Sequence, residues 1–374
     1  MRPSPFVLAA WLGACAPAQP TDSAPSKPAE PWTVEAAAPD TANGIRILIL
    51  HDMEGLSGQN DPATFDFGSP MYPKGQELLV ADINAVVEGL YAGGATEVQV
   101  VDGHGSGNPD PDVRRDLLDP RATQVLRDKD FDAYFDLVTP GAYDAVAVVG
   151  MHAKTGSRGF ASHTLTAGIG VVINGRAITE TELMGLSWGR QGIPIIFASG
   201  DDRLGADLAG MTWLEYVTVK KATAADSAEL RPVAEARAEL TAKARKAAEN
   251  LRAGRAKSMR VSLPLVAGLK AVPPASLAML DGIPGIAYAD SVLSFPADSI
   301  QQAYDVIEKL VGAATGGYTS VLHRGLRASP AGPAIMAQFR IDVERAWFDY
   351  ESGRWQRPAP PPAPAGSRKY HGYQ

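Results

Sequence analysis

Residues 45–54 read IRILILHDME, an apolar run that ends in a histidine and two carboxylates. A short run rich in Ile and Leu and bounded by polar residues is typical of a buried parallel strand. Two similar runs follow: residues 98–101 lead into His104, and residues 145–149 lead into His152. The pattern predicts three parallel strands that each deliver polar side chains just beyond the carboxyl end.

These side chains form the donor set of a metal site. Ligands of open α/β sheets bind beyond the carboxyl ends of the strands. Asp52 and Glu54 are two residues apart, so in an extended segment both point to one side, where they repel unless a cation lies between them. With His104 and His152 they suit a divalent metal, most readily zinc. Singly, each could be a solvated carboxylate or a structural histidine; their joint placement favours a metal site.

The rest of the folded region predicts an α/β fold with a mostly parallel sheet flanked by helices. Apolar residues recur at helical spacing over 76–91, which implies a right-handed crossover between the first two strands. Further strands are predicted at 193–198 and 216–219. A long, strongly charged helix is predicted at 227–251.

A hairpin and a small subdomain complete this prediction. The Asn-Gly pair at 174–175 predicts a β-hairpin over 170–179. Thr179 is then expected to cap a helix reaching Arg190, with Glu182 in the capping-box position.

Residues 273–322 predict a small C-terminal α/β subdomain with a short helix, a strand around 289–293 and a helix at 299–311. Residues 334–350 mix apolar and aromatic residues without a clear period and receive no assignment.

Both ends of the chain have compositions typical of segments outside a fold. A positive charge, an apolar run and the motif LGAC ending at Cys15 resemble a bacterial lipoprotein signal, in which residues 1–14 are removed and Cys15 is lipidated. An ordinary secretory signal is the alternative. The Pro- and Ala-rich residues 15–43 predict a disordered tether, and 358–374 predict a disordered tail.

These boundaries leave residues 44–325 as a catalytic domain that includes the subdomain, followed by an extension of uncertain structure at 326–357. The net charge of −7 and the pI of 5.5 argue against nucleic acid as the main partner. No run approaches the roughly 18 to 20 apolar residues of a membrane-spanning helix. Cys15 is the sole cysteine, so an intramolecular disulfide is excluded.

Three further residues have two interpretations each. His163, in a Gly-rich loop, could be a general acid or base or an oxyanion donor, or a surface histidine. Glu180 could be a metal ligand, or it could be acidic simply because it begins the helix after the hairpin, where the helix dipole favours acidic residues. His51 should face away from Asp52, in the core or behind the metal ligands.

Six ordered motifs together resemble the D-aminopeptidase family of di-zinc metallopeptidases, over roughly residues 45–315. They are DMEGLSG at 52–58, DGHG at 102–105, GMHA at 150–153, SHT at 162–164, INGR at 173–176 and GDD at 200–202. The resemblance implies that Asp52 bridges two zinc ions, that His163 is the catalytic histidine, and that the other ligands pair as Glu54 with His152 and His104 with Glu180.

The chain departs from the family pattern in three ways. The family has Gly-Glu-Thr-Gly around its last ligand, whereas residues 179–182 read Thr-Glu-Thr-Glu, and the extra carboxylate leaves the local geometry open. His51 replaces a small or apolar residue. The resemblance to a lipoprotein signal predicts a protein anchored by lipid in the bacterial cell envelope, whereas the family pattern is cytoplasmic.

The expected function is a lipid-anchored di-zinc aminopeptidase that removes N-terminal residues from short peptides. The resemblance alone implies D-amino acids such as D-alanine, for which peptidoglycan fragments are one source. It also implies a ring-shaped homo-oligomer, in its best-known form a decamer. One alternative is a di-metal hydrolase of another amide or of a phosphoester, for which Lys154 and Arg158 supply basic groups. Another is a lipoprotein that binds peptide or metal without turnover.

Overall fold

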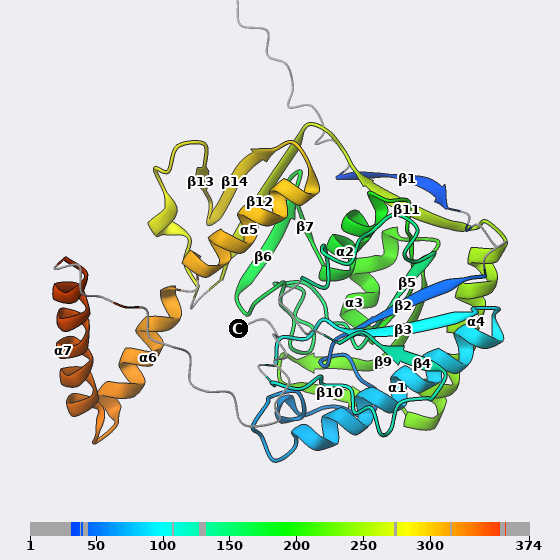
Figure 1. The fold of residues 1–374 in the computed structure, drawn as a ribbon, viewed down its shortest axis with the longest axis horizontal. Coiled ribbons are helices and arrows are strands. Elements are labelled where there is room, and N and C mark those ends of the chain that lie inside the picture. The colour runs from blue at the N-terminus through cyan, green and yellow to red at the C-terminus, as the bar shows by residue number, and fades with distance from the viewer. Residues whose placement is uncertain are drawn as a thin grey trace, which may run out of the picture.

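A computed structural model describes residues 31–37, 39, 44–106, 108–126, 132–272, 275–314, 316–351 and 356. It shows an α/β fold built on two sheets (Figure 1). The helices are α1 (Tyr72–Ala92), α2 (Glu180–Gly189), α3 (Asp202–Asp207), α4 (Val233–Arg252), α5 (Ile300–Ala314), α6 (Gly316–Ala328) and α7 (Gly332–Glu351). Single 3-10 turns lie at Pro62–Thr64, Leu208–Gly210 and Ala278–Leu280.

A seven-stranded sheet forms the centre of the fold. From edge to edge its strands are β10 (Ser227–Leu230), β9 (Glu215–Ala224), β8 (Ile195–Asp201), β5 (Ala145–Val149), β2 (Arg46–His51), β3 (Glu97–Asp102) and β4 (Ala122–Gln124). Neighbouring strands run parallel except β10, which is antiparallel to β9. The predicted mostly parallel sheet is confirmed.

Helices and a second sheet bury both faces of this central sheet. On β2, Ile47 and Ile49 belong to the apolar cluster that contains α1 and α4, while Leu48 and Leu50 belong to the cluster that contains α2 and the second sheet. All four side chains are fully buried. Because alternate residues of a strand face opposite sides, burial of both faces explains why this strand is a continuous apolar run.

The second sheet is antiparallel and has five strands. They are, in order, β13 (Ala287–Ala289), β14 (Val292–Ala297), β12 (Leu265–Ala271), β6 (Ile169–Ile173) and β7 (Arg176–Ile178). The predicted hairpin is β6–β7, with φ of 47° at Asn174 and 80° at Gly175, the left-handed pair that an Asn-Gly turn favours. The predicted subdomain is thus one part of a larger unit, because its strands pair through β12 with this hairpin.

The structure corrects the expectation of a fully disordered tether at 15–43. Residues Trp32–Ala37 form β1, which pairs antiparallel with β11 (Ala256–Val261). The Trp32 ring also lies 4.3 Å from the guanidinium carbon of Arg176. A strand paired with a segment more than 200 residues away leaves little trace in local composition. Residues 1–14 and Cys15, like the tail at 358–374, lie outside the described residues.

Two other element predictions were wrong in part. Residues 227–230, expected to begin the long helix, form β10, and α4 begins only at Val233. Pro232 is the reason, because proline lacks the N–H that a helix interior requires. The strand expected around 289–293 is interrupted by a turn at Asp290 and Ser291, which have positive φ: Ala289 ends β13, and residues 292–293 begin β14.

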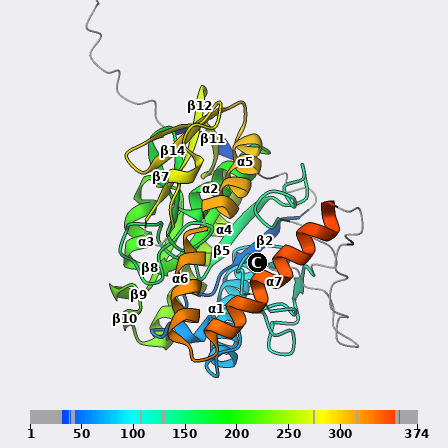
Figure 2. The ribbon, with the colours of Figure 1, turned by 90° about the vertical axis from the view of Figure 1, so that its left-hand side faces the viewer.

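The last two helices lie beside the body of the protein. Residues 334–350, left unassigned by the sequence, fall within α7, which pairs with α6 and projects from the side that carries α5 (Figure 1; Figure 2). Several of their apolar side chains are 47–60% exposed, namely Val321, Leu322, Ile335, Phe339 and Ile341. Among the described helices, none combines the length and the apolar character needed to cross a membrane.

Candidate metal centre

Strand register brings the predicted ligands to one edge of the central sheet. His51, the last residue of β2, lies opposite Asp102 of β3 and Val149 of β5. The residues that follow these strands therefore meet, and the Asp52 N–H donates to the Val149 carbonyl at 2.8 Å. Glycine permits this closeness, because a Cβ on Gly55 would lie 2.0 Å from the Met151 carbonyl oxygen.

The structure brings all six predicted site residues together. His104 Nε2 lies 3.5 Å from Glu54 Oε1, and His152 Nε2 lies 3.3 Å from Asp52 Oδ2 and 3.5 Å from Glu180 Oε1. The side chains form three sets, and within each set the potential ligand atoms lie within 4.8 Å of one another. The sets are Asp52, Glu54 and His104; Asp52, His152 and Glu180; and Glu54, His152 and His163. Asp52 is thus shared by two sets that together include the five predicted metal ligands.

The division of ligands differs from the one that the family resemblance implied. In the two sets that share Asp52, Glu54 lies with His104 and His152 lies with Glu180, whereas the resemblance paired Glu54 with His152 and His104 with Glu180. Glu54 and His152 also share the third set, with His163. Strand order places the two histidines apart: β2, which leads into Asp52, lies between β3, which leads to His104, and β5, which leads to His152. In the described chain, His104 and Glu180 share none of these sets.

The electrostatics of the cluster favour an added cation. Burial, and then the charge of Glu54, raise the pKa of Asp52. Burial opposes protonation of His152, but Glu180 and Asp52 outweigh it and raise its pKa to about 10. Burial likewise opposes charge on His104, yet Glu54 and Asp112 hold its pKa well above the usual value. The carboxylates that hold protons on both imidazoles would equally stabilise a divalent ion in place of those protons.

The donor atoms also fit zinc. His152 Nε2 is buried and makes no hydrogen bond to any described residue, although two carboxylate oxygens lie within 3.5 Å. A buried nitrogen that faces oxygens without a hydrogen-bond partner is the arrangement expected of a metal-ligating imidazole. Two carboxylates and one imidazole in each Asp52-containing set match the oxygen and nitrogen ligands that zinc accepts.

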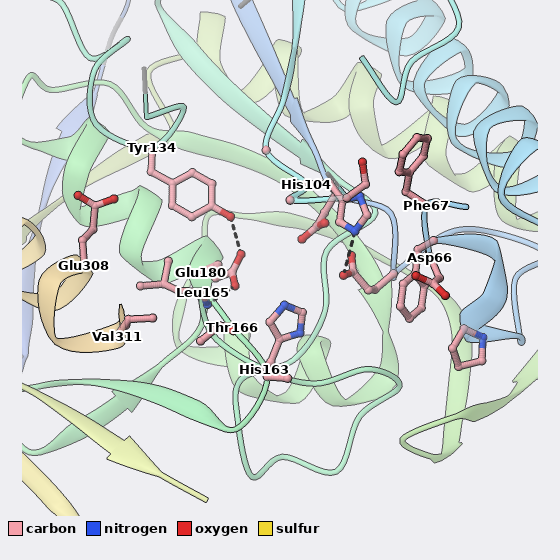
Figure 3. Close-up of a pocket in the computed structure, with 18 of the residues that line it drawn as sticks. Asp66, Phe67, His104, Tyr134, His163, Leu165, Thr166, Glu180, Glu308 and Val311 are labelled. Atoms are coloured by element: carbon pink, nitrogen blue, oxygen red, sulfur yellow. Dashed lines mark hydrogen bonds and ion pairs between the residues drawn. The ribbon is translucent and has the colours of Figure 1, made fainter. Parts of the chain in front are cut away.

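His163 lies against this cluster on a loop. Its ring stacks on that of His152, with centroids 3.8 Å apart and planes 11° apart. Its Nδ1 lies 2.7 Å from the Ala161 carbonyl oxygen, which can only accept, so Nδ1 carries the hydrogen and Nε2 is left for a ligand or a substrate. His163 also lines the cavity in front of the cluster (Figure 3).

The two residues that made the motifs atypical have structural partners. Glu182 completes the predicted capping box, because its backbone N–H donates to Thr179 Oγ1 at 3.0 Å and its side chain accepts from the Thr179 N–H at 2.8 Å. It also forms an ion pair with Arg176, so the extra carboxylate has its own partners and does not join the ligands around Glu180. His51 is fully buried, 3.9 Å from Asp102, and belongs to none of the three sets.

Several residues that support the site were missed by the sequence analysis. Glu180 accepts hydrogen bonds from the Tyr134 hydroxyl at 2.5 Å and the Leu165 N–H at 2.6 Å. Lys220 is buried beneath the ligand loop and donates from Nζ to the Glu54 carbonyl at 2.5 Å; burial lowers its pKa to about 7. The position of Lys220 directly after the strand predicted at 216–219 was the available signal for it. Asp112 behind His104 had no comparable signal.

The cavity in front of the cluster has a volume of about 850 Å³. Apolar and aromatic side chains form much of its wall, and among them are Phe65, Phe67, Leu165, Tyr304 and Val311. Asp66 and Glu308 lie at its sides, and its described lining includes no Lys or Arg (Figure 3). Lys154, which the sequence offered for phosphate chemistry, instead pairs with Asp207 and Ser157. The chamber is of a size that suits a small ligand.

Comparison with known proteins supports the fold and the family resemblance. A sequence profile of peptidase family M55, described as D-aminopeptidase, matches residues 45–309. A D-aminopeptidase of Bacillus subtilis (strain 168) is 28% identical over 161 residues, which are 42% of this chain and 57% of that protein. The aligned segment thus spans little more than half of that relative.

A solved structure shares the fold. It is a Zn-dependent D-aminopeptidase from B. subtilis, DppA, described as a self-compartmentalizing protease. The TM-score is 0.64 at 21% identity, over 72% of this chain and 98% of that one. Helices α6 and α7 lie beyond the segment that the family profile matches.

Proposed function

Because this chain belongs to the D-aminopeptidase family of peptidases, we propose that it is a zinc-dependent aminopeptidase that removes the N-terminal residue of short peptides. The observation that carries the proposal is the pair of ligand sets sharing Asp52, with His163 beside them at one cavity. We propose two zinc ions per chain, one for each set. A D-amino acid such as D-alanine is proposed on the family relationship, and peptidoglycan fragments are the proposed source.

The chain's own residues would divide the work as follows. Asp52 would bridge the ions, with Glu54 and His104 on one and His152 and Glu180 on the other. Bound zinc would supply a nucleophilic hydroxide near neutral pH and polarise the scissile carbonyl. His163 would move a proton at Nε2, either at the carbonyl oxygen or at the leaving amine. The carboxylates Asp66 and Glu308 give the cavity the charge that attracts a free amino terminus.

Metal analysis combined with a substrate panel tests this proposal. We expect about two zinc ions per chain, and faster hydrolysis of D-Ala-D-Ala than of L-Ala-L-Ala. A phosphodiester should be a poor substrate, because the described cavity lining has no Lys or Arg to hold a phosphate. Phosphodiester turnover exceeding peptide turnover would favour the other di-metal hydrolase, and peptide binding without any turnover would favour the non-catalytic lipoprotein.

Membrane attachment through Cys15 is a separate proposal. The motif ending at Cys15 supports lipidation, and this cysteine is the one residue that could carry the lipid. Cys15→Ser is therefore expected to move the protein from the membrane fraction to the soluble fraction, because stable anchoring needs acyl chains. Fractionation of cells expressing each form measures it. A wild-type protein found in the soluble fraction would contradict the anchor.

We also propose that the protein assembles into a homo-oligomer, in the family's ring-shaped form a decamer. The description of the structural neighbour as self-compartmentalizing supports this proposal. Light scattering on the Cys15→Ser protein measures the assembly without interference from lipid. A monomeric mass across the accessible concentration range would contradict it.

A further inference from the structure

The two ligand sets look alike in their donors but differ in what lies behind them. Each set contains two carboxylates and one imidazole, and Asp52 is common to both. Any difference in their affinity for a cation must therefore come from the partners of the remaining ligands.

A buried carboxylate stands behind His104. Asp112 Oδ2 lies 2.7 Å from His104 Nδ1, the ring nitrogen opposite the one that faces Glu54. Asp112 is 1% exposed. Its two side-chain oxygens face the donors His104 Nδ1 and Ser106 Oγ, an arrangement that suits a carboxylate. A carboxylate only accepts hydrogen bonds, so Nδ1 carries the hydrogen and the Nε2 lone pair is directed to the ligand set.

Other groups hold Asp112 in place. Its Oδ1 accepts from Ser106 Oγ at 2.7 Å and from the Tyr72 hydroxyl at the start of α1. The loop itself is fixed on Asp102, whose two carboxylate oxygens accept from the His104 N–H and the Asp112 N–H, both at 2.9 Å. One carboxylate at the end of β3 thus sets both ends of the His104–Asp112 pair.

Among the described residues, no carboxylate stands behind His152 in the same way. His152 Nδ1 lies 3.1 Å from the carbonyl oxygen of Ala153, a neutral acceptor. A carboxylate raises the basicity of an imidazole more than a carbonyl does, so His104 is the stronger nitrogen donor. Glu180 accepts hydrogen bonds from the Tyr134 hydroxyl at 2.5 Å and the Leu165 N–H at 2.6 Å, and these donors lower the basicity of its oxygens. Glu54 accepts a longer hydrogen bond, 3.1 Å, from the Met53 N–H. Both differences weaken the His152 set.

We propose that Asp112 is a positioning residue that makes the Asp52–Glu54–His104 set the tighter zinc site, so that the two ions bind in order. The inference rests on the proposed use of zinc. It predicts two resolvable dissociation constants in the wild-type protein, the smaller of which depends on Asp112.

Zinc competition with a chromophoric chelator tests the assignment. Asp112→Ala should raise the smaller dissociation constant about 10- to 100-fold, the usual effect of losing such a partner, and should change the larger one less. Asp112→Asn keeps an acceptor oxygen without the charge and should lie between Asp112→Ala and wild type. Absorption spectra recorded while cobalt is added stepwise report which site fills first. In the Asp112 variants, the spectrum of the first cobalt equivalent should differ from that of the wild type.

Two matched variants separate this role from a structural one. Asp110→Asn alters an exposed carboxylate on the same loop and should leave both constants unchanged. Tyr134→Phe removes a donor from Glu180 and should leave the smaller constant unchanged. Thermal unfolding of the metal-free proteins shows whether each variant is folded. If Asp112→Ala is unfolded, the zinc affinities of Asp112→Asn test the proposal instead.

Two outcomes would overturn the inference alone: equal constants in the wild type, or a rise of both constants by the same factor in the Asp112 variants. A wild-type protein that binds no zinc would instead sink the proposed aminopeptidase together with it.

Discussion

Asp52→Ala is expected to lose both zinc binding and peptide hydrolysis. Its carboxylate belongs to both candidate ligand sets, so its removal weakens the two together. The loss in affinity should exceed the about 10- to 100-fold effect of removing a partner behind a ligand. Hydrolysis should fall to background, because the nucleophile and the carbonyl activation both depend on the metals. Elemental analysis after gel filtration, with D-Ala-D-Ala hydrolysis on the same samples, measures both effects.

The metal-free fold should survive this change. Burial and Glu54 raise the pKa of Asp52, which means that its charge is held at a cost without a cation. The melting temperature of metal-free Asp52→Ala should therefore equal or exceed that of metal-free wild type. Asp116→Ala, which alters an exposed carboxylate beside Arg114, is the control and should keep zinc and activity. An Asp52→Ala protein that retains two zinc ions would exclude the bridging role.

His163→Ala is expected to keep both metals and lower turnover by roughly 10² to 10⁴, the usual contribution of a positioned acid or base. The two sets that share Asp52 hold five ligands without it. Its Nδ1 is engaged by the Ala161 carbonyl and its ring is held against His152, which leaves Nε2 for the substrate. Zinc content and kcat at saturating D-Ala-D-Ala should be measured on one preparation.

The competing role for His163 is that of a ligand, because it also forms a set with Glu54 and His152. Loss of zinc as readily as in Asp52→Ala would establish that role, and near-normal turnover would exclude a catalytic one. His323→Ala is a suitable control, since His323 lies on α6, beyond the segment matched to the family. It should change neither measurement.

Features that depend on neighbouring residues could be predicted from the sequence. Strand β5 was predicted with the bounds it has, because a strand buried on both faces must be apolar throughout. The turn at 174–175 and the Thr179–Glu182 capping box were confirmed, since both arise within four residues. The same holds for the metal-ligand residue types at the strand ends, which follow from where the apolar runs stop.

Features that depend on distant partners could not be predicted from the sequence. Strand β1 exists because β11, more than 200 residues away, offers it an edge, and β12 was missed although it joins the hairpin to the subdomain. Pairing of this kind is a property of two segments, whereas composition and periodicity describe one.

The candidate site divides along the same line. The residue types that follow β2, β3 and β5 can be read from the sequence, and they predicted a metal site with Asp52, Glu54, His104 and His152. The roles of Glu180 and His163 were implied only by the family resemblance. How these ligands group in space depends on strand order and side-chain direction, and the two sets that share Asp52 group them differently from the pairing that the family resemblance implied. Asp112 behind His104 and Lys220 beneath Glu54 likewise emerge only in three dimensions, because a hydrogen bond requires atoms within about 3 Å, a distance that sequence separation does not encode.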